Sequence, residues 1–191
     1  MPTATAHELD ALYRNNADPW NFLTSAYERE KYQRTMASLP RGHYRYALEV
    51  GCSIAVLGRM IAARCDHYLG VDASRRALSH AERHARPNMR FREYWLPNQF
   101  PQGDFDLVVL SEILYFLCPQ DVTRLARQVS IAAPAGDILC VNMLGATDRE
   151  LDGTTAVGIF GAALNRPQVC TRMAGGYRID VFAGHGEHVR D

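Results

Sequence analysis

Two acidic residues lie where expected buried strands end, and their side chains have the chemistry to bind or activate a ligand. Asp72 follows the apolar run 68–71, and Glu112 follows the run 104–110 and Ser111. In a doubly wound sheet the carboxyl ends of the strands face the ligand crevice. Asp72 can therefore accept hydrogen bonds from ribose hydroxyls, and Glu112 is a candidate to orient or deprotonate a substrate. The alternative for Glu112, a helix cap or a surface pair with an arginine, stays open.

The stretch 47–57 has the pattern of a buried strand, a tight turn of small residues and a helix. Backbone N–H groups in such a turn approach a ligand closely when the residues carry little side chain. Asp72 lies 72 − 51 = 21 residues after Gly51, the spacing at which an acidic residue reaches a ribose. A glycine turn alone would suit any α/β protein, but the turn and the carboxylate together predict a ligand that contains a nucleoside.

The glycine pattern indicates which nucleoside fits. A dinucleotide site needs G-x-G-x-x-G so that the backbone reaches the pyrophosphate, whereas this chain has Gly51, Ser53 and Val56. NAD and FAD therefore fit poorly. S-adenosylmethionine has no pyrophosphate, and the run Glu49-x-Gly51-x-Ser53-x-Ala55 resembles the first motif of class I S-adenosylmethionine-dependent methyltransferases, with Ala55 in place of the usual third glycine.

Two aromatic residues in the second half of the expected sheet are further candidates. Many class I methyltransferases have an Asp near the end of the third strand that binds the adenine amino group, and alignment on Leu96 and Pro97 places Trp95 there. Trp95 either stacks on adenine or fills the groove beside it. Tyr115, one turn after Glu112, is a weaker catalytic candidate because a tyrosine there more often packs in the core.

Residues 1–45 precede the first core strand and predict a cap of two or three short helices. Ser25 and Glu28 have the spacing of a capping box. The cap is rich in aromatic side chains, and two interpretations stay open for them. Either they form a satellite core cluster, or the cap is a lid that excludes water while Trp20 and Tyr32 pack around the cofactor.

The elements that must position these residues form an α/β sheet with crossover helices. Apolar runs predict five strands, at 47–50, 68–71, 89–94, 104–110 and 138–143. Helical spacing predicts helices from Ile54, from the cap residue Ser74 and from Pro119, with a smaller one near 156–164. Two further strands, 169–173 and 177–183, predict a terminal hairpin with an antiparallel strand.

Composition bounds the class of protein and its partners. The 191 residues suit one domain, and Lys plus Arg equal Asp plus Glu at 21 each, which gives no argument for nucleic acid or an anionic membrane. The five cysteines are odd in number and widely spaced, and no apolar leader or membrane-spanning run appears, so we expect a reduced, cytoplasmic setting. His80 and His84 lie among charged residues, which favours a solvated helix face, and we predict no metal site.

The chain resembles the rhizobial nodulation protein S methyltransferases from about residue 10 to 182. The resemblance rests on five segments: Asp18–Phe22, Tyr27–Tyr32, Leu48–Cys52, Gly70–Asp72 and Phe105–Tyr115. It implies a Rossmann-like class I methyltransferase fold, with a mostly parallel seven-stranded sheet, an antiparallel terminal strand and an N-terminal helical cap. It also implies N-methylation of the free amine on the terminal glucosamine of a deacetylated chitooligosaccharide, in synthesis of the nodulation signal.

One methyltransferase domain is expected over 1–191, divided into a cap or lid (1–45), a Rossmann-like core (46–184) and a tail (185–191). The predicted catalytic residues are Glu112 and Tyr115. The residues predicted to bind S-adenosylmethionine are Trp20, Glu49, Gly51, Cys52, Ser53, Asp72, Ala73, Trp95, Leu96 and Ser111. Two alternatives stay open, a methyltransferase of another small amine or hydroxyl compound and a non-catalytic cofactor-binding module; the oligomeric state is not predicted.

Overall fold

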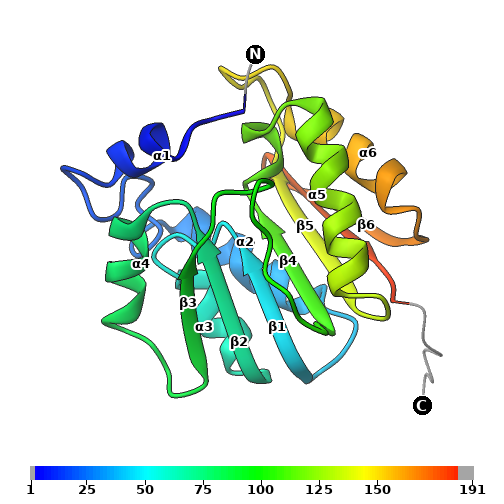
Figure 1. Cartoon of the computed structure of the whole chain (residues 1–191), viewed down its shortest axis with the longest axis horizontal. Helices are drawn as coiled ribbons and strands as arrows, with labels where there is room; N and C mark the ends of the chain where they lie inside the picture. Colours follow the sequence, from blue (N-terminus) through cyan, green and yellow to red (C-terminus); the bar gives the residue numbers. More distant parts are fainter. Residues whose placement is uncertain (1–2, 185–191) are drawn as a thin grey trace.

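The computed structural model describes residues 3–184, and Figure 1 shows a central sheet with helices on both faces. The predicted tail 185–191, with His185 and His188, lies outside the described residues. Within 3–184 no helix is both long and apolar enough to cross a membrane.

Seven strands form one sheet in the order β3-β2-β1-β4-β5-β7-β6. Their bounds are β1 Tyr44–Val50, β2 Cys65–Asp72, β3 Met89–Glu93, β4 Leu107–Ser111, β5 Asp137–Met143, β6 Gln168–Ala174 and β7 Tyr177–Phe182. The pairings among β1 to β5 are parallel, whereas β7 runs antiparallel to both β5 and β6. The predicted parallel sheet with a terminal antiparallel hairpin is confirmed.

The helices form a layer on each face of the sheet. Their bounds are α1 Ala6–Leu12, α2 Ala26–Ala37, α3 Val56–Ala62, α4 Arg75–Glu82, α5 Pro119–Ala132 and α6 Gly153–Leu164, with a short 3-10 helix η1 at Leu114–Phe116. Apolar residues of α5 and α6 pack on one face of the sheet, and those of α2, α3 and α4 pack on the other. This two-sided burial explains why β4 is a continuous apolar run rather than an alternating one.

Strand alternation decides which side chains reach each layer. In β1, Leu48 and Val50 pack with the α5 and α6 layer, while Ala47 faces the opposite layer, which contains α3. Because β1, β2, β4 and β5 are parallel, their carboxyl ends share one edge of the sheet. Helix α1 lies beyond this edge, near α4, whereas α2 lies behind the sheet in the view of Figure 1.

Two element boundaries differ from the sequence prediction for identifiable reasons. Helix α3 begins at Val56 rather than near Ile54, because Ser53 and Ala55 adopt left-handed φ values of 50° and 56°. Strand β4 begins at Leu107 rather than near residue 104. The preceding Asp106 carboxylate accepts hydrogen bonds from two backbone N–H groups at the start of β1, both at 2.8 Å.

The cap contains two helices, within the range predicted. Between them Asp18 and Pro19 begin a turn. The Asp18 carboxylate accepts the backbone N–H groups of Phe22 at 2.8 Å and Leu23 at 2.9 Å. A side chain that caps a loop in this way stabilises the turn without a helix behind it.

Close packing of α3 on β1 predicts a strong effect of one methyl group. A Cβ at Gly58 would overlap the Tyr68 hydroxyl and lie 2.6 Å from Glu49 Oε2, whereas a Cβ at Gly158 of α6 would meet no atom within 4 Å. We expect Gly58→Ala to lower the free energy of unfolding by about 1–3 kcal/mol. The control Gly158→Ala should raise it by about 0.5–1 kcal/mol. Urea denaturation measures both, and equal stability of the two variants would contradict the packing described for α3.

Candidate active site

A cavity of about 400 Å³ lies at the carboxyl edge of the sheet, between the strand ends and the cap. All twelve residues predicted for the site line it: Trp20, Glu49, Gly51, Cys52, Ser53, Asp72, Ala73, Trp95, Leu96, Ser111, Glu112 and Tyr115. The structure therefore brings residues from both halves of the chain to one space. Their individual roles stay predictions.

The turn after β1 forms one wall of this cavity, and alternate residues of it are left-handed. Gly51, Ser53 and Ala55 have φ values of 72°, 50° and 56°. Ala55, at the position of the usual third glycine, thus keeps the conformation that a glycine would take. Residues other than glycine pay about 1–2 kcal/mol for this conformation, so the turn needs support from outside.

Asp72 supplies that support at the end of β2. Its Oδ2 accepts the Ser53 N–H and its Oδ1 accepts the Ser74 N–H, both at 2.8 Å. Burial raises the pKa of Asp72, and the backbone N–H groups oppose the shift. Each oxygen retains room for one more donor, so the geometry is compatible with the predicted ribose contact.

The cap closes over the same turn through a buried tyrosine. The Tyr13 hydroxyl lies 2.6 Å from Ser53 Oγ, and burial raises the pKa of Tyr13 far above its usual range. The Tyr13 ring meets Trp20 edge-on at 5.5 Å between centroids, and Trp20 stacks with Phe22 at 5.4 Å. The sequence prediction did not include Tyr13, because only the folded chain places it against the turn.

The predicted adenine side of the cavity is more open. The side chain of Trp95 is 41% exposed, while Leu96 is 8% exposed and precedes a cis peptide bond to Pro97. Trp20, on the cap, is 40% exposed. Both tryptophans line the cavity and are partly exposed, which leaves the two sequence interpretations of Trp95 open.

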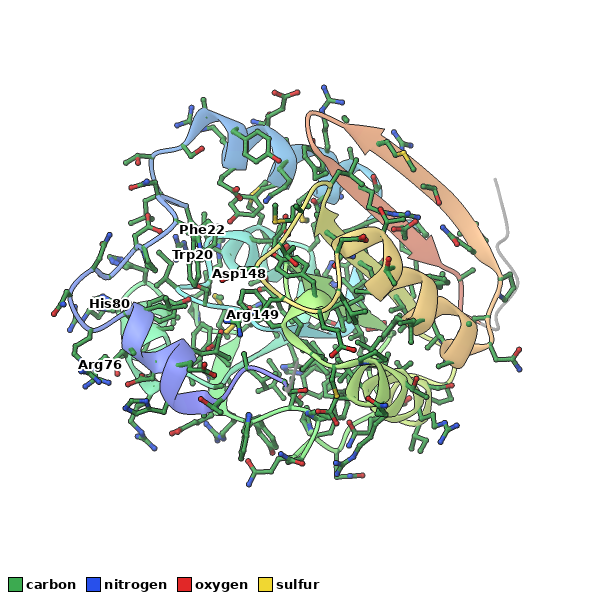
Figure 2. The ribbon with its side chains drawn as sticks, turned by 90° about the horizontal axis from the view of Figure 1, so that it is seen from above. Trp20, Phe22, Arg76, His80, Asp148 and Arg149 are labelled. Atoms are coloured by element: carbon green, nitrogen blue, oxygen red, sulfur yellow. The ribbon has the colours of Figure 1, made fainter. Side chains whose placement is uncertain are left out.

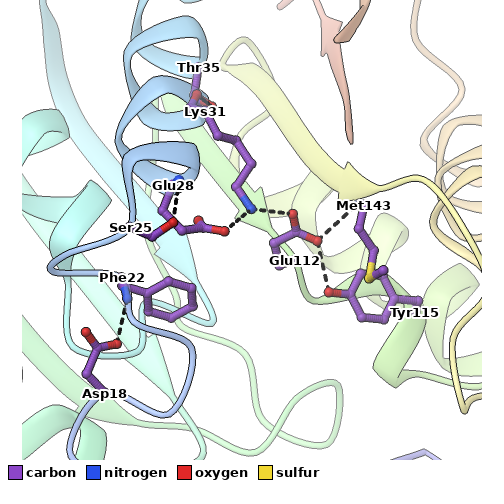
Figure 3. Close-up of polar contacts among 9 residues, drawn as sticks. All are labelled: Asp18, Phe22, Ser25, Glu28, Lys31, Thr35, Glu112, Tyr115 and Met143. Atoms are coloured by element: carbon purple, nitrogen blue, oxygen red, sulfur yellow. Dashed lines mark hydrogen bonds and ion pairs between the residues drawn. The ribbon is translucent and has the colours of Figure 1, made fainter. Parts of the chain in front are cut away.

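Glu112 lies at the opposite end of the cavity, directly after β4, with a left-handed φ of 58°. Its Oε2 accepts the Tyr115 hydroxyl and the Met143 N–H, both at 2.9 Å, and its Oε1 accepts Lys31 Nζ at 2.8 Å (Figure 3). Burial and the Glu112 charge raise the pKa of Tyr115 far above its usual range. Glu112 thus pairs with a buried lysine. It neither caps a helix nor pairs with a surface arginine.

Lys31 and Glu28 of α2 complete this cluster, and the sequence prediction missed both. Lys31 Nζ donates to Glu28 Oε1 at 2.9 Å as well as to Glu112. Burial by itself would lower the pKa of Lys31, but the two carboxylates outweigh it and raise that pKa. The available signal was their three-residue spacing, which places both on one face of a helix.

The remaining predicted residues line the cavity at the ends of β1, β2 and β4. Ser111 ends β4, Ala73 follows Asp72, and Cys52 is buried in the turn. Glu49 is buried and accepts a hydrogen bond from the Tyr68 hydroxyl. Burial raises the pKa of Glu49 to about 8, although the tyrosine bond opposes the shift.

Two polar residues of α4, Arg76 and His80, lie away from the site. Figure 2 places His80 and Arg76 at the periphery, while Trp20 and Phe22 lie nearer the centre of the view. His80 accepts a long contact from Arg83 at 3.4 Å. Among the described residues, no group of three or more His, Cys, Asp or Glu side chains could hold a metal ion.

Residues 3–173 match the family model of nodulation protein S. Nodulation protein S of Sinorhizobium fredii is 30% identical over 157 residues, which cover 78% of this chain and 71% of that protein. Nodulation protein S of Bradyrhizobium diazoefficiens is 28% identical over 181 residues, which cover 82% of this chain and 81% of that protein.

The fold also matches solved structures of methyltransferases. The N-methyltransferase NodS of Bradyrhizobium japonicum, solved in complex with S-adenosylhomocysteine, superposes with a TM-score of 0.82. It is 20% identical, and the match covers 95% of this chain and 98% of that one. This likeness confirms the predicted Rossmann-like methyltransferase fold.

The raised pKa of Glu49 predicts a pH-dependent stability. The folded protein keeps Glu49 protonated up to about pH 8, whereas the ordinary pKa is 4.5. Between these values the folded state binds the extra proton, so stability falls as pH rises. Glu49→Gln has no carboxyl group to titrate and should not lose stability in this way. The difference in free energy of unfolding, variant minus original chain, should therefore increase by about 2–4 kcal/mol from pH 5 to pH 8.5. Urea titrations at both pH values measure it; a constant difference would contradict the buried, protonated Glu49.

Proposed function

This chain belongs to the nodulation protein S family, and on that premise we propose that it is an S-adenosylmethionine-dependent N-methyltransferase in nodulation factor synthesis. The acceptor is the free amine on the terminal glucosamine of a deacetylated chitooligosaccharide. One observation carries the proposal: a single cavity has the turn and Asp72 at one end and the Glu112 cluster at the other. Cofactor and amine would thus meet inside one space.

The residues present fit the cofactor. The small side chains of the turn let a ligand approach its backbone, whose Gly51, Cys52 and Ser53 N–H groups already donate to the Val71 carbonyl and to Asp72. Asp72 keeps acceptor capacity on both oxygens. We assign the ribose to Asp72, the methionyl part to the 51–53 backbone, and the adenine to Trp95 and Leu96. When bound, S-adenosylmethionine supplies a methyl group on an already activated sulfonium.

The protein's own contribution is to position the amine and to remove water. Tyr13, Trp20 and Phe22 form an aromatic cluster over the turn, and exclusion of water strengthens the electrostatic interactions inside. Glu112 is held by three donors, so it can orient an amine without moving. Orientation of this kind is a large part of the rate when the leaving group is already activated.

A cytoplasmic location belongs to the same proposal. All five cysteines are free thiols, at positions 52, 65, 118, 140 and 170. Free thiols persist in a reducing compartment.

Calorimetric titration with S-adenosylhomocysteine, followed by transfer from labelled S-adenosylmethionine, tests the function. We expect binding, and label on a chitooligosaccharide with a free terminal amine but not on the fully N-acetylated sugar. Asp72→Ala should weaken binding about 10-fold or more, because it removes the ribose acceptor and the support of the turn. Binding without transfer to the amine would refute the acceptor, and no binding would refute the cofactor.

A second prediction concerns Glu112. Glu112→Gln keeps the size of the side chain but removes the charge that pairs with Lys31. We expect methyl transfer to fall about 10-fold or more, with the dissociation constant of S-adenosylhomocysteine nearly unchanged. Glu93→Gln is the matched control, since Glu93 ends β3 in an exposed pair with Arg75 outside the cavity. Equal turnover in the two variants would remove Glu112 from the mechanism.

A further inference from the structure

The first turn of α2 has the sequence of a capping box but forms only half of its hydrogen bonds. In α1, Thr5 and Glu8 form a complete capping box: the Glu8 N–H donates to Thr5 Oγ1, and the Thr5 N–H donates to Glu8 Oε2 at 2.7 Å. In α2 the same spacing gives half of this motif. The Glu28 N–H donates to Ser25 Oγ at 3.2 Å, but the Glu28 carboxylate bonds to Lys31 instead of returning to the cap.

One oxygen of the Glu28 carboxylate also has no hydrogen-bond donor. Oε1 accepts Lys31 Nζ, whereas Oε2 is buried and has no hydrogen-bond partner. Glu28 is 9% exposed overall and lines the cavity. The Tyr32 hydroxyl interacts with the Glu28 side chain: burial, the Glu28 charge and this contact raise the pKa of Tyr32, although the contact falls short of hydrogen-bond geometry at Oε2. A buried acceptor without a partner in a native protein commonly marks the place of a ligand or water.

Glu112 is more fully occupied than Glu28. Two donors, Tyr115 and the Met143 N–H, already use its Oε2, and Lys31 uses its Oε1. Glu28 and Glu112 both line the cavity, and of these two carboxylates it is Glu28 that has an oxygen without a donor (Figure 3). The cluster of Glu28, Glu112 and Lys31 contains two anions and one cation, so it favours a positive charge that develops nearby.

We propose that Glu28 Oε2 accepts the N–H of the acceptor amine and takes the proton that the nitrogen loses. This assignment rests on the proposed function and deepens it. The lone pair of the amine nitrogen forms the bond to the methyl carbon as the carbon–sulfur bond breaks with its electron pair staying on sulfur. The nitrogen is then cationic, one of its protons passes to Glu28 Oε2, and the proton leaves to water with the product. Glu112 and Lys31 position Glu28.

The test compares Glu28→Gln with Glu30→Gln, a carboxylate on the same helix that pairs with Arg34 in solvent. We expect Glu28→Gln to lower kcat/KM for the free-amine sugar about 100-fold or more, and Glu30→Gln to leave it nearly unchanged. The dissociation constant of S-adenosylhomocysteine should be the same in both. The melting temperature of Glu28→Gln should not fall, because a glutamine can complete the capping box with Ser25.

Binding provides a readout that is independent of turnover. With S-adenosylhomocysteine bound, the original chain should bind glucosamine in preference to N-acetylglucosamine, and Glu28→Gln should lose that preference. Glu28→Asp retains the charge beside Lys31 but withdraws the free oxygen, so it should fold and lose the preference as well. Either variant that keeps the preference, or Glu28→Gln with unchanged kcat/KM, overturns the proposal. If the original chain methylates no sugar, the proposed function fails, while the amine preference still decides the role of Glu28.

Discussion

The hydrogen bond from the Ser53 N–H to Asp72 is the interaction on which the rest of the site depends. It holds a turn in which three alternate residues are left-handed although only Gly51 is a glycine. Strained backbone of this kind persists only where neighbouring groups determine it. Because the other oxygen of Asp72 accepts the Ser74 N–H, one carboxylate fixes both the turn after β1 and the start of α4. The Tyr13 hydroxyl then meets Ser53, which makes the position of the cap depend on the same turn.

At the other end of the cavity, three charged side chains join the cap to the sheet: the buried Glu28 and Lys31 and the half-buried Glu112. An ammonium between two carboxylates removes most of the cost of burying any one of them, but such clusters contribute more to a defined geometry than to net stability. Lys31 connects α2 with Glu112, the residue after β4. Glu112 in turn accepts the Met143 N–H at the end of β5. The acceptor end of the site is thus built from charge, whereas the cap over the turn is built from aromatic rings.

The sequence predicted the parts of the fold that local patterns specify. Apolar runs located the parallel strands, and the spacing from Gly51 to Asp72 identified two residues that line the same cavity, because strand ends of a parallel sheet meet at one edge. Glu112 followed from the same rule. Glu28 did not, since its spacing from Ser25 suggested an ordinary capping box, and its actual partners depend on tertiary structure. Lys31 and Glu112 are 81 positions apart, a separation that no local pattern describes.

The N-terminal position of the cap has a consequence for how the protein is made. Ala4 and Lys31 leave the ribosome well before the groups they bond to, the Phe116 carbonyl and Glu112. Lys31 pairs with Glu28 within α2, but its bond to Glu112 forms only when β4 has joined the sheet. Docking of the cap is then a late event during synthesis, and a nascent chain that stops short of Glu112 exposes the aromatic face of residues 13–32.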